Sequence, residues 1–335
     1  MKFSNRARVA LIGLIIIVGI FLWSWSQPTK TETVRLGLPT QPTMALVKVA
    51  LVKNFFEAEG LTIEVKEFTA GKFALQGLVG GSLDLITPAE LPITLASSNG
   101  EKLSVLAEIN ETIGGFPLVL RKDGDNLDLS KYFAKKRKIA TSIGGGPEFF
   151  TYELFKKYKI SSDQYELVSM KPEDMPIALA RGDVDGIAIF EPFAQFSIQK
   201  TGEDKVFVFK DDQLYSETIV LVGKTDWIRK NEKTVTKFLG ALKQAEAYTE
   251  NNQAETQNIM SNFTKLDKET LKSIWPTFTL KLSLNPELIS TMEREALWAK
   301  ETGKLKEGTT IPDFREIVSG DLLRKILPAN TILEN

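Results

Sequence analysis

The sequence predicts an α/β protein with two Rossmann-like lobes joined by two hinge crossings. Two observations indicate this class. A strand–helix–strand–helix–strand pattern begins near Val34 and begins again near Lys138, about a hundred residues later; it is typical of a parallel sheet with helical crossovers. The chain also has 335 residues, 43% of them hydrophobic, which is sufficient for one or two packed cores.

The first unit combines alternating strands with amphipathic helices. Pro42 stands near the first turn of its first helix, where a missing N–H costs nothing, and Gly60 ends that helix. In chain order the predicted elements are a strand at 34–38, a helix at 43–59, a strand at 61–68, a helix at 72–79 and a strand at 83–87.

The second unit repeats this order with matching turns. Gly-Ser-Leu-Asp at 81–84 corresponds to Gly-Asp-Val-Asp at 182–185, and each turn leads into an apolar strand followed by a proline, Pro88 or Pro192. Pro147 takes the place of Pro42. The predicted elements are a strand at 138–141, a helix at 147–158, a strand at 165–169, a helix at 173–180 and a strand at 186–190.

Two facing units of this size would enclose a cleft. The expected crossings between them, at 114–117 and 211–217, contain glycine or polar residues suited to hinge motion. A strand at 218–222 and helices between 228 and 328 would complete the first lobe. The predicted organisation is a signal peptide or N-terminal membrane anchor at 1–26, a tether at 27–33, a first lobe at 34–115 and 217–335, and a second lobe at 116–216.

The N-terminus has the pattern of an export signal. Lys2, Arg6 and Arg8 precede an apolar run at 9–25. Cleavage after Ser26 is one outcome; the run is also nearly long enough to span a bilayer, so retention as an anchor is the other. We therefore expect an exported protein, in the periplasm or at the outer face of the inner membrane.

The composition excludes several kinds of chemistry. The chain has no cysteine and no histidine, which removes disulfides, thiol nucleophiles, Ser-His-Asp triads and the common zinc sites. No cofactor is expected, and only a carboxylate metal site is conceivable. A formal net charge of −1 offers no footprint for nucleic acid. The basic run at 135–138 is expected to edge a strand on a solvated face.

Ligands of open parallel sheets bind at the carboxyl ends of strands, against helix N-termini. A glycine run at 144–146 allows close approach of the backbone, and the N–H groups of Gly145, Gly146 and Glu148 are expected to be free to face an anion. The loops in such positions are 39–44, 87–91, 142–149 and 190–193.

Other residues near these loops have alternative roles. Thr43 and Met44 would offer an opposing helix start, and the Glu148 carboxylate is a rival for an anionic ligand because it complements the same helix dipole. Glu191 could accept hydrogen bonds from an amine or bond the backbone of a hinge. An aromatic wall and the core are the two alternatives for Phe149, Phe150, Phe190 and Phe193.

An ordered set of stretches resembles the nitrate/sulfonate/taurine group of substrate-binding proteins, which also includes binders of thiamine-precursor pyrimidines. The stretches are Val-Arg-Leu-Gly at 34–37, Phe-Phe-Glu-Ala-Glu-Gly-Leu at 55–61, Gly-Gly-Ser-Leu-Asp at 80–84, Gly-Pro-Glu-Phe-Phe at 146–150 and Asp-Val-Asp-Gly-Ile-Ala-Ile-Phe-Glu-Pro-Phe at 183–193. The resemblance covers residues 34–327. Phe190 stands where this family usually has tryptophan.

This resemblance implies a type II periplasmic-binding fold, closure of two lobes around one ligand and delivery of that ligand to an ABC-type permease. The pyrimidine-handling enzymes of the wider group depend on histidine, which this chain lacks. Carried over onto the matching motifs, the resemblance implies ligand neighbours at Ser142, Gly145, Gly146 and Glu191, together with Thr43 and Pro88.

The leading hypothesis is a monomeric, exported binding protein for a small anion or zwitterion, such as an organosulfonate. Its partners would be the ligand and the membrane subunits of an ABC permease. An envelope sensor is one alternative. An enzyme on the same fold is another, with acid–base candidates at Glu90, Glu148 and Glu191. The expected ligand-binding set is Thr43, Met44, Pro88, Ser142, Gly145, Gly146 and Glu191.

Overall fold

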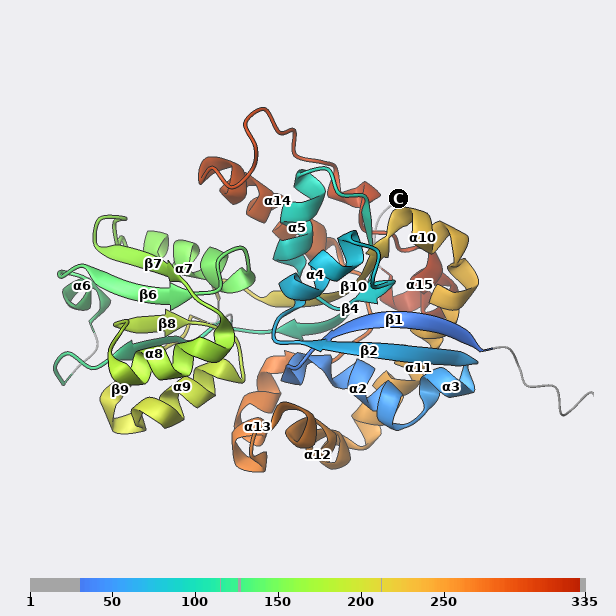
Figure 1. Cartoon of the computed structure of the whole chain (residues 1–335), viewed down its shortest axis with the longest axis horizontal. Helices are drawn as coiled ribbons and strands as arrows, with labels where there is room; N and C mark the ends of the chain where they lie inside the picture. Colours follow the sequence, from blue (N-terminus) through green and yellow to red (C-terminus); the bar gives the residue numbers. More distant parts are fainter. Residues whose placement is uncertain (1–30, 115, 126–127, 212, 332–335) are drawn as a thin grey trace, which may run out of the picture.

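The computed structural model describes residues 31–114, 116–125, 128–211 and 213–331. These residues form two mixed β-sheets, each covered by helices, which lie beside one another (Figure 1). The predicted α/β class with two lobes is therefore confirmed. We call the six-stranded sheet and the helices packed on it the first lobe, and the five-stranded sheet with its helices the second lobe.

The six-stranded sheet has the order β11-β4-β10-β3-β1-β2. Its strands are β1 (Glu32–Pro39), β2 (Leu61–Phe68), β3 (Leu85–Ile86), β4 (Leu103–Thr112), β10 (Glu217–Lys224) and β11 (Phe278–Thr279). The helices before the second lobe are η1 (Pro42–Met44), α2 (Ala45–Val52), α3 (Phe55–Ala58), α4 (Gly71–Val79) and α5 (Glu90–Ser98). Those after it are α10 (Thr225–Lys230), α11 (Glu232–Asn251), α12 (Gln253–Thr264), α13 (Lys268–Ile274), η4 (Trp275–Thr277), α14 (Pro286–Glu301), η5 (Phe314–Glu316), α15 (Asp321–Ile326) and η6 (Pro328–Asn330).

The five-stranded sheet has the order β7-β6-β8-β5-β9. Its strands are β5 (Leu118–Arg121), β6 (Arg137–Thr141), β7 (Tyr165–Ser169), β8 (Gly186–Ala188) and β9 (Val206–Phe209). Its helices are α6 (Leu129–Tyr132), α7 (Gly146–Lys157), η2 (Pro172–Asp174), α8 (Met175–Arg181), α9 (Phe193–Thr201) and η3 (Glu203–Lys205).

The predicted duplication is confirmed by the strand pairing. In the first lobe β1 lies between β2 and β3, parallel to both. In the second lobe β6 lies between β7 and β8, also parallel to both. The next strand in each sheet, β10 or β5, is antiparallel. Parallel strands end at the same edge of their sheet. The loops after β1 and β3 therefore lie at one edge of the first sheet, and the loops after β6 and β8 lie at one edge of the second sheet.

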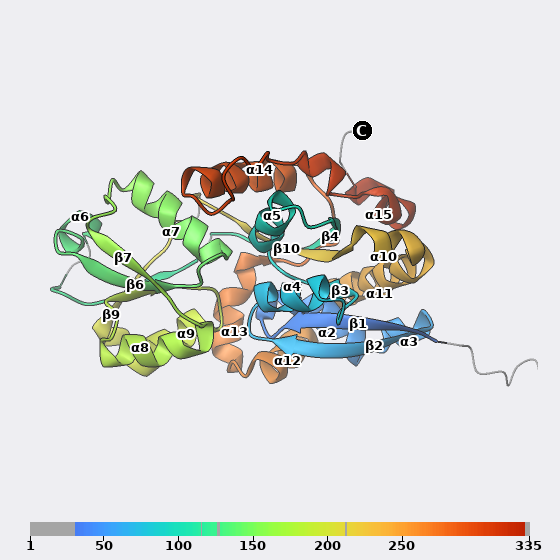
Figure 2. The ribbon, with the colours of Figure 1, turned by 45° about the horizontal axis from the view of Figure 1, so that its top comes forward.

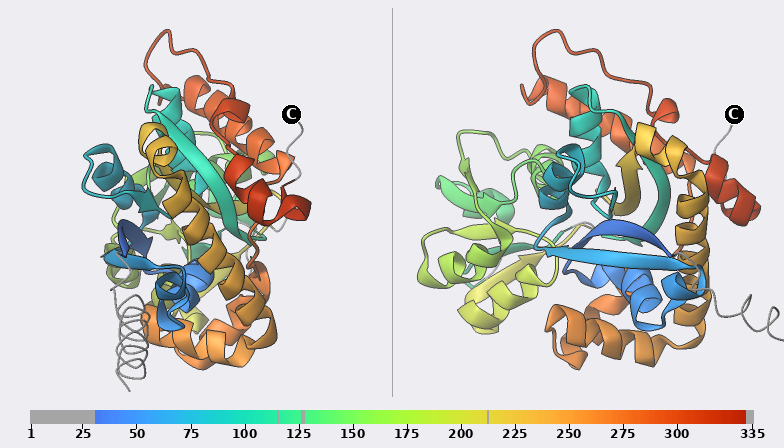
Figure 3. Two further views of the ribbon diagram at one scale, coloured as in Figure 1. Left: turned by 90° about the vertical axis from the view of Figure 1, so that its right-hand side faces the viewer. Right: turned by 45° about the vertical axis from the view of Figure 1, so that its right-hand side comes forward.

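Strand β1 contributes buried side chains to the core of the first lobe. Leu36 and Leu38 of β1 are completely buried, and Phe56 of α3 packs on Phe238 of α11 with ring centroids 4.6 Å apart. Figure 3 shows α11, coloured gold, beside the blue helices α2 and α3. Each such buried side chain contributes about 1.5–3 kcal/mol relative to exposure.

Some predicted elements were wrong in detail. The single helix expected at 43–59 is η1, α2 and α3, because Asn54 adopts the left-handed conformation (φ 58°) that interrupts the helical hydrogen bonds. The strands expected at 83–87 and 186–190 have only two and three residues, as β3 and β8. The elements between β3 and β6, and β9, were not predicted from the sequence.

Helix α14 connects the lobes beside the second crossing. It packs on α5 of the first lobe, and Trp298 near its end packs on Phe149 of α7 with ring centroids 5.2 Å apart. Figure 2 shows α14 extending along the top of the molecule toward α7. The hydrophobic cluster of the second lobe thus includes Trp298 and Leu305. The lobe boundaries stated above stay a prediction.

The N-terminal predictions concern residues that lie outside the described ones. These are the apolar run at 9–25, cleavage after Ser26 and most of the tether at 27–33. In the part of the chain that the structure describes, no helix has both the length and the apolar character needed to cross a membrane.

Candidate functional site

The candidate site is a cleft between the lobes, which we call the interlobe cleft. It consists of two adjoining hollows that open to solvent and share Gln41, Phe190 and Glu217. The hinge pocket, of about 550 Å³, is lined by the crossing residues, for example Gly114 and Phe116. The glycine-loop pocket has about 370 Å³ and is lined by Pro39, Gln41, Ala70, Gly71, Lys72, Thr87, Ala89, Pro92, Ser142, Gly145, Gly146, Pro147, Phe190 and Glu217. Both volumes include solvent that enters between the lobes, which is a common place for a small ligand to bind.

The expected strand-end loops all contribute to the interlobe cleft. Thr43 and Glu191 line the hinge pocket, whereas Ser142, Gly145 and Gly146 line the glycine-loop pocket. The structure therefore brings these five predicted residues together from both lobes. Their contact with a ligand stays a prediction.

Two predicted residues lie behind the wall of the cleft. Met44 is completely buried, and its sulfur lies 3.2 Å from the hydroxyl of Thr87. Pro88 uses its carbonyl oxygen to accept the N–H of Val220 at 2.9 Å, which joins its loop to β10. Neither residue lines the two pockets. The sequence shows which loop a residue belongs to, but it does not show which way the loop turns the side chain.

Two buried hydroxyl groups in the cleft wall lack a protein partner. Thr43 is 7% exposed and Ser142 is 1% exposed, and among the described residues neither hydroxyl oxygen has a hydrogen-bond partner. A buried hydroxyl without a partner costs free energy of about 1–3 kcal/mol. One hydroxyl comes from each lobe, and polar ligand atoms or waters at the two positions would satisfy them.

The glycine loop differs from the expectation of free N–H groups. Gly145 donates its N–H to the carbonyl of Ser142 at 3.0 Å, and Glu148 donates its N–H to the carbonyl of Gly145 at 2.9 Å. The expectation was wrong for these two groups, because the loop closes its own turn. In the described chain, the N–H of Gly146 has no protein acceptor.

The contacts of Glu148 are those expected of a carboxylate that would compete with an anionic ligand. Its carboxylate accepts the N–H of Gly144 at 2.8 Å and pairs with the ammonium group of Lys304. The side chain thereby places negative charge at the N-terminus of α7, where the helix dipole stabilises it. The carboxylate of Glu148 therefore already interacts with part of the positive potential at the start of α7, which an anionic ligand would otherwise meet.

Lys72 of α4 connects the two lobes across the glycine-loop pocket. Its ammonium group donates to the carbonyl of Ile143 in the second lobe at 2.8 Å. Burial lowers the pKa of Lys72, and the nearby charge of Glu148 opposes that shift. The side chain both lines the pocket and holds the two lobes together.

Glu191 bonds the backbone of helix α9, and its contact with a ligand amine stays a prediction. Its carboxylate accepts the N–H of Gln195 in α9 at 3.0 Å while the residue lines the hinge pocket. Burial raises the pKa of Glu191, against the effects of that hydrogen bond and of Lys210.

Of the four phenylalanines near the strand-end loops, Phe190 lines both pockets, whereas Phe149 and Phe150 are buried core. Phe193 packs on Phe190 with ring centroids 5.8 Å apart.

Glu217 is a cleft residue that the sequence did not single out. It begins β10, is 5% exposed and lines both pockets. Burial and the charge of Glu90 raise its pKa well above the usual value. A carboxylate directly before the apolar stretch 219–222 in a predicted crossing was the available signal.

A second group of buried carboxyls lies behind Glu217. Tyr215 donates to Glu90, and its hydroxyl also lies 3.2 Å from Glu295 of α14. Thr218 donates its N–H to Glu90 at 2.9 Å, and Thr94 donates to Glu295 at 2.8 Å. Burial raises the pKa of Glu90 to about 7 and that of Glu295 well above its usual value. This group connects the second crossing to the first lobe.

The acid–base candidates of the enzyme hypothesis are not brought together. Glu90 is fully buried outside both pockets, and Glu148 is paired with Lys304. Glu191 alone of the three lines the cleft. The described residues contain no group of acidic side chains that could hold a metal ion.

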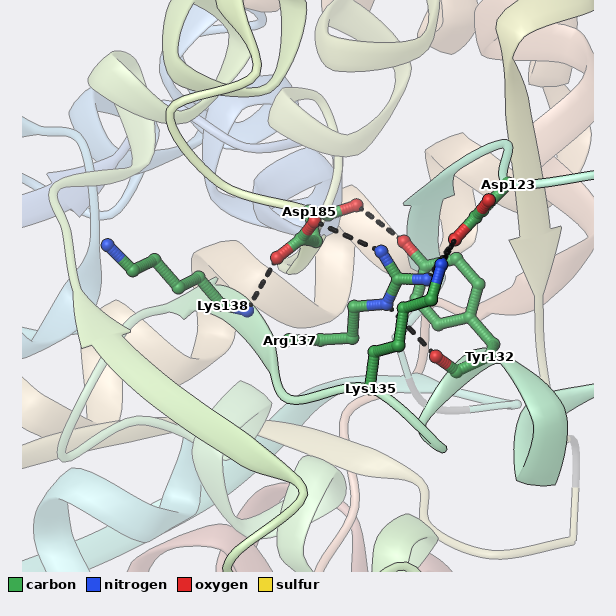
Figure 4. A network of polar contacts seen from close by, with 6 residues as sticks. All are labelled: Asp123, Tyr132, Lys135, Arg137, Lys138 and Asp185. Atoms are coloured by element: carbon green, nitrogen blue, oxygen red, sulfur yellow. Dashed lines mark hydrogen bonds and ion pairs between the residues drawn. The ribbon is translucent and has the colours of Figure 1, made fainter.

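The basic run at 135–138 edges β6 as predicted. Arg137 is the first residue of that strand and pairs with Asp123 and Asp185, while its guanidinium carbon lies 4.2 Å from the ring centroid of Tyr132 (Figure 4). Lys135 lies 3.7 Å from Asp123. Its charges therefore stabilise the end of a strand, far from the residues that line the cleft.

The chain is similar to known proteins over most of its length. The model of the NMT1-like family matches residues 27–263. A protein of Bacillus subtilis (strain 168) named as a binding protein, YtlA, is 25% identical over 334 residues, covering 96% of this chain and 97% of the relative. Another protein of that strain, named as an aliphatic sulfonates-binding protein, is 20% identical over 328 residues, covering 94% and 96%.

Solved structures have the same architecture. The alkanesulfonate-binding protein SsuA from Xanthomonas axonopodis pv. citri, bound to MOPS, superposes with a TM-score of 0.75 at 17% identity. The superposition covers 87% of this chain and 99% of that one. This likeness shows that the two chains share a fold.

Proposed function

Because this chain belongs to the NMT1-like family and has the fold of periplasmic binding proteins, we propose that it is the extracytoplasmic solute-binding protein of an ABC importer. Its ligand is a small anion or zwitterion of the sulfonate, taurine or nitrate type. The interlobe cleft holds this ligand, and its delivery to the membrane subunits of the importer follows. The names of the relatives and the shape of the cleft support this proposal.

The observation that carries the proposal is the pair of hydroxyls at Thr43 and Ser142. They are buried, they have no hydrogen-bond partner among the residues that the structure describes, and they come from opposite lobes. A ligand whose polar atoms accept from each of them would replace two unmade hydrogen bonds, each contributing about 1.5–3 kcal/mol when the acceptor is charged. The N–H of Gly146 is a further donor beside Ser142 in the glycine-loop pocket.

Closure of the lobes supplies the rest of the affinity. The crossings after β4 and β9 are the hinges, and Lys72 joins the lobes through the carbonyl of Ile143. A closed cleft excludes water and strengthens every polar contact inside it. A ligand that contacts both lobes therefore favours the closed state by its differential affinity.

Binding of sulfonates tests the proposal directly. Calorimetry and thermal unfolding are measured with ethanesulfonate, taurine and nitrate, for the wild type and for Thr43→Val and Ser142→Ala. We expect stabilisation by at least one probe, and a roughly ten- to hundredfold loss of its affinity in each variant. Thr249→Val and Ser98→Ala are matched controls, because each removes a buried, unpartnered hydroxyl outside the cleft. Equal losses in the controls would contradict the assignment.

The cellular setting follows from the same proposal. The protein is exported, acts as a monomer, and works in the periplasm or at the outer face of the inner membrane, with residues 9–25 as a cleaved signal or an anchor. Lobe 1 comprises 34–115 and 217–335, and lobe 2 comprises 116–216. The proposed role is binding and not catalysis. A sensor would use the same cleft with a different partner, which crosslinking in membranes would identify.

A further inference from the structure

Glu217 is a buried carboxyl in the wall of the cleft. Of the residues that the structure describes, none donates a hydrogen bond or offers a cation to it. The side chain of Glu217 reaches both pockets. A Cβ atom built at Gly146 would lie 2.9 Å from one of its carboxyl oxygens. Glu217 also lines the hinge pocket beside Phe116 and Phe190. A carboxyl in such a place costs free energy unless something binds it.

The neighbouring carboxyls of Glu90 and Glu295, in contrast, accept hydrogen bonds from the protein. Glu90 accepts from Tyr215 and from the N–H of Thr218, and Glu295 accepts from Thr94. These groups are fully buried and have their hydrogen bonds made by the protein. The contrast indicates that Glu217 is not part of this structural group, although it adjoins it, and that its partner comes from the cleft.

Donors for an anion and carboxyl groups are unevenly distributed along the cleft, and Glu217 lies where the two pockets meet. The glycine-loop pocket contains donors for an anion: the hydroxyl of Ser142, the N–H of Gly146 and the ammonium of Lys72. The hinge pocket contains the carboxyls of Glu191 and Glu217, together with aromatic rings. Carboxylates and aromatic faces are the groups that bind an ammonium ion. Lys210, which is exposed, is the cation at that end.

We propose that Glu217 is the specificity-determining residue of an amine subsite in the hinge pocket. The ligand is then a zwitterion, with an anionic group at the glycine loop and a cationic nitrogen against Glu217 and Glu191. This inference rests on the proposed function and narrows it, because nitrate and simple alkanesulfonates lack the nitrogen cation. Amino-sulfonates and ω-amino acids have both groups.

Matched pairs of probes test the subsite. Each pair differs only by the amine: taurine and ethanesulfonate, 3-aminopropanesulfonate and propanesulfonate, β-alanine and propionate. Affinities are measured by calorimetry for the wild type, for Glu217→Gln, and for Glu301→Gln as a control at an exposed position of α14. Glutamine keeps the size of the side chain and removes its charge, so that folding is retained.

The expected result is a preference of about tenfold or more for an amine-bearing probe in the wild type and in the control, as one charged hydrogen bond provides. Glu217→Gln should reduce that preference to within about twofold. Equal or tighter binding of the amine-free probes would overturn the subsite and leave the binding function intact. Binding of no probe by the folded wild type would overturn both the proposed ligand class and this inference. A preference that survives in Glu217→Gln would assign the amine to another residue.

Discussion

Asp84 and Asp185 make the same backbone contacts in two different sheets. Asp84 accepts the N–H of Arg35 in β1 at 2.9 Å and donates its own N–H to the carbonyl of Arg35 at 2.8 Å. Asp185 does the same with Lys138 in β6, at 2.8 and 2.9 Å. The duplication seen in the sequence as two similar turns is therefore a duplication of hydrogen bonds.

The two aspartates should differ in their contribution to stability. The side chain of Asp84 is 7% exposed, whereas that of Asp185 is 36% exposed. Loss of a buried, charged acceptor costs about 1.5–3 kcal/mol, and loss of an exposed one costs less. We expect Asp84→Ala to lower the free energy of unfolding by about 2–3 kcal/mol in urea titrations and Asp185→Ala to lower it by about 1 kcal/mol.

The exposed Asp204 is a reference position for this comparison, because it lies in η3 without an ion pair to the described residues. Asp204→Ala should change the free energy of unfolding by no more than about 0.5 kcal/mol. If Asp185→Ala proved as harmful as Asp84→Ala, burial would not be what distinguishes the two turns.

Gly146 is predicted to be intolerant of any side chain. A Cβ atom there would lie 2.9 Å from an oxygen of Glu217 and 3.0 Å from the ring of Phe116. Because this overpacks the junction of the lobes, we expect Gly146→Ala to cost about 1–3 kcal/mol of stability. Ligand affinity measured by calorimetry should fall by at least tenfold.

Gly81 offers a contrasting control, since it has a positive φ of 77° and open space around it. Gly81→Ala should lose about 1 kcal/mol of stability through backbone strain alone, with ligand affinity unchanged. Similar affinities of the two variants would show that Gly146 does not govern the cleft.

The strand–helix units were predictable because their signals are local. The bounds of β2 and β7 are those expected from alternating residues, and Gly60 ends α3 as expected. The interruption at Asn54 was not predictable, because the stretch 43–59 is amphipathic throughout. A left-handed residue inside such a stretch depends on packing with distant helices.

The site was predictable as a set of loops and not as a set of contacts. Thr43, Ser142 and Glu191 were placed in the cleft because strand ends of parallel sheets converge. Glu217 was missed because its importance depends on what surrounds it: its sequence neighbours do not show that Gly146 lies against its carboxyl. The hydrogen bond from the N–H of Gly145 to Ser142 likewise depends on the conformation of the loop, which the sequence does not show.

Stability should decrease as the pH rises toward neutrality. The folded protein holds the pKa of Glu90 at about 7, against 4.5 ordinarily, so the folded state binds more protons between these values. The stabilising contribution of Glu90 is therefore full below about pH 4.5 and is lost as the pH rises through about 7. For Glu90 the loss is about 3 kcal/mol, and Glu295 and Glu217, whose pKa values are also raised, act in the same direction.

Urea titrations between pH 4.5 and 8 measure this dependence. Glu90→Gln cannot ionise, so its stability should change less with pH than that of the wild type. The three carboxyls are close enough to titrate as a group, and some slope should therefore remain. An identical slope in the variant and the wild type would remove Glu90 from the explanation.

Lys72 is predicted to favour the closed arrangement of the lobes. Its ammonium group spans the cleft to the carbonyl of Ile143 at 2.8 Å. Lys72→Met keeps most of the aliphatic length and removes this hydrogen bond, so the free protein should populate more open states. We expect a larger radius of gyration in small-angle scattering without ligand, and an affinity for the best probe that is weaker by about tenfold. Lys102→Met, at an exposed position of the first lobe, should leave both quantities unchanged. A Lys72→Met protein with wild-type dimensions and a weaker affinity would instead assign Lys72 to direct contact with the ligand.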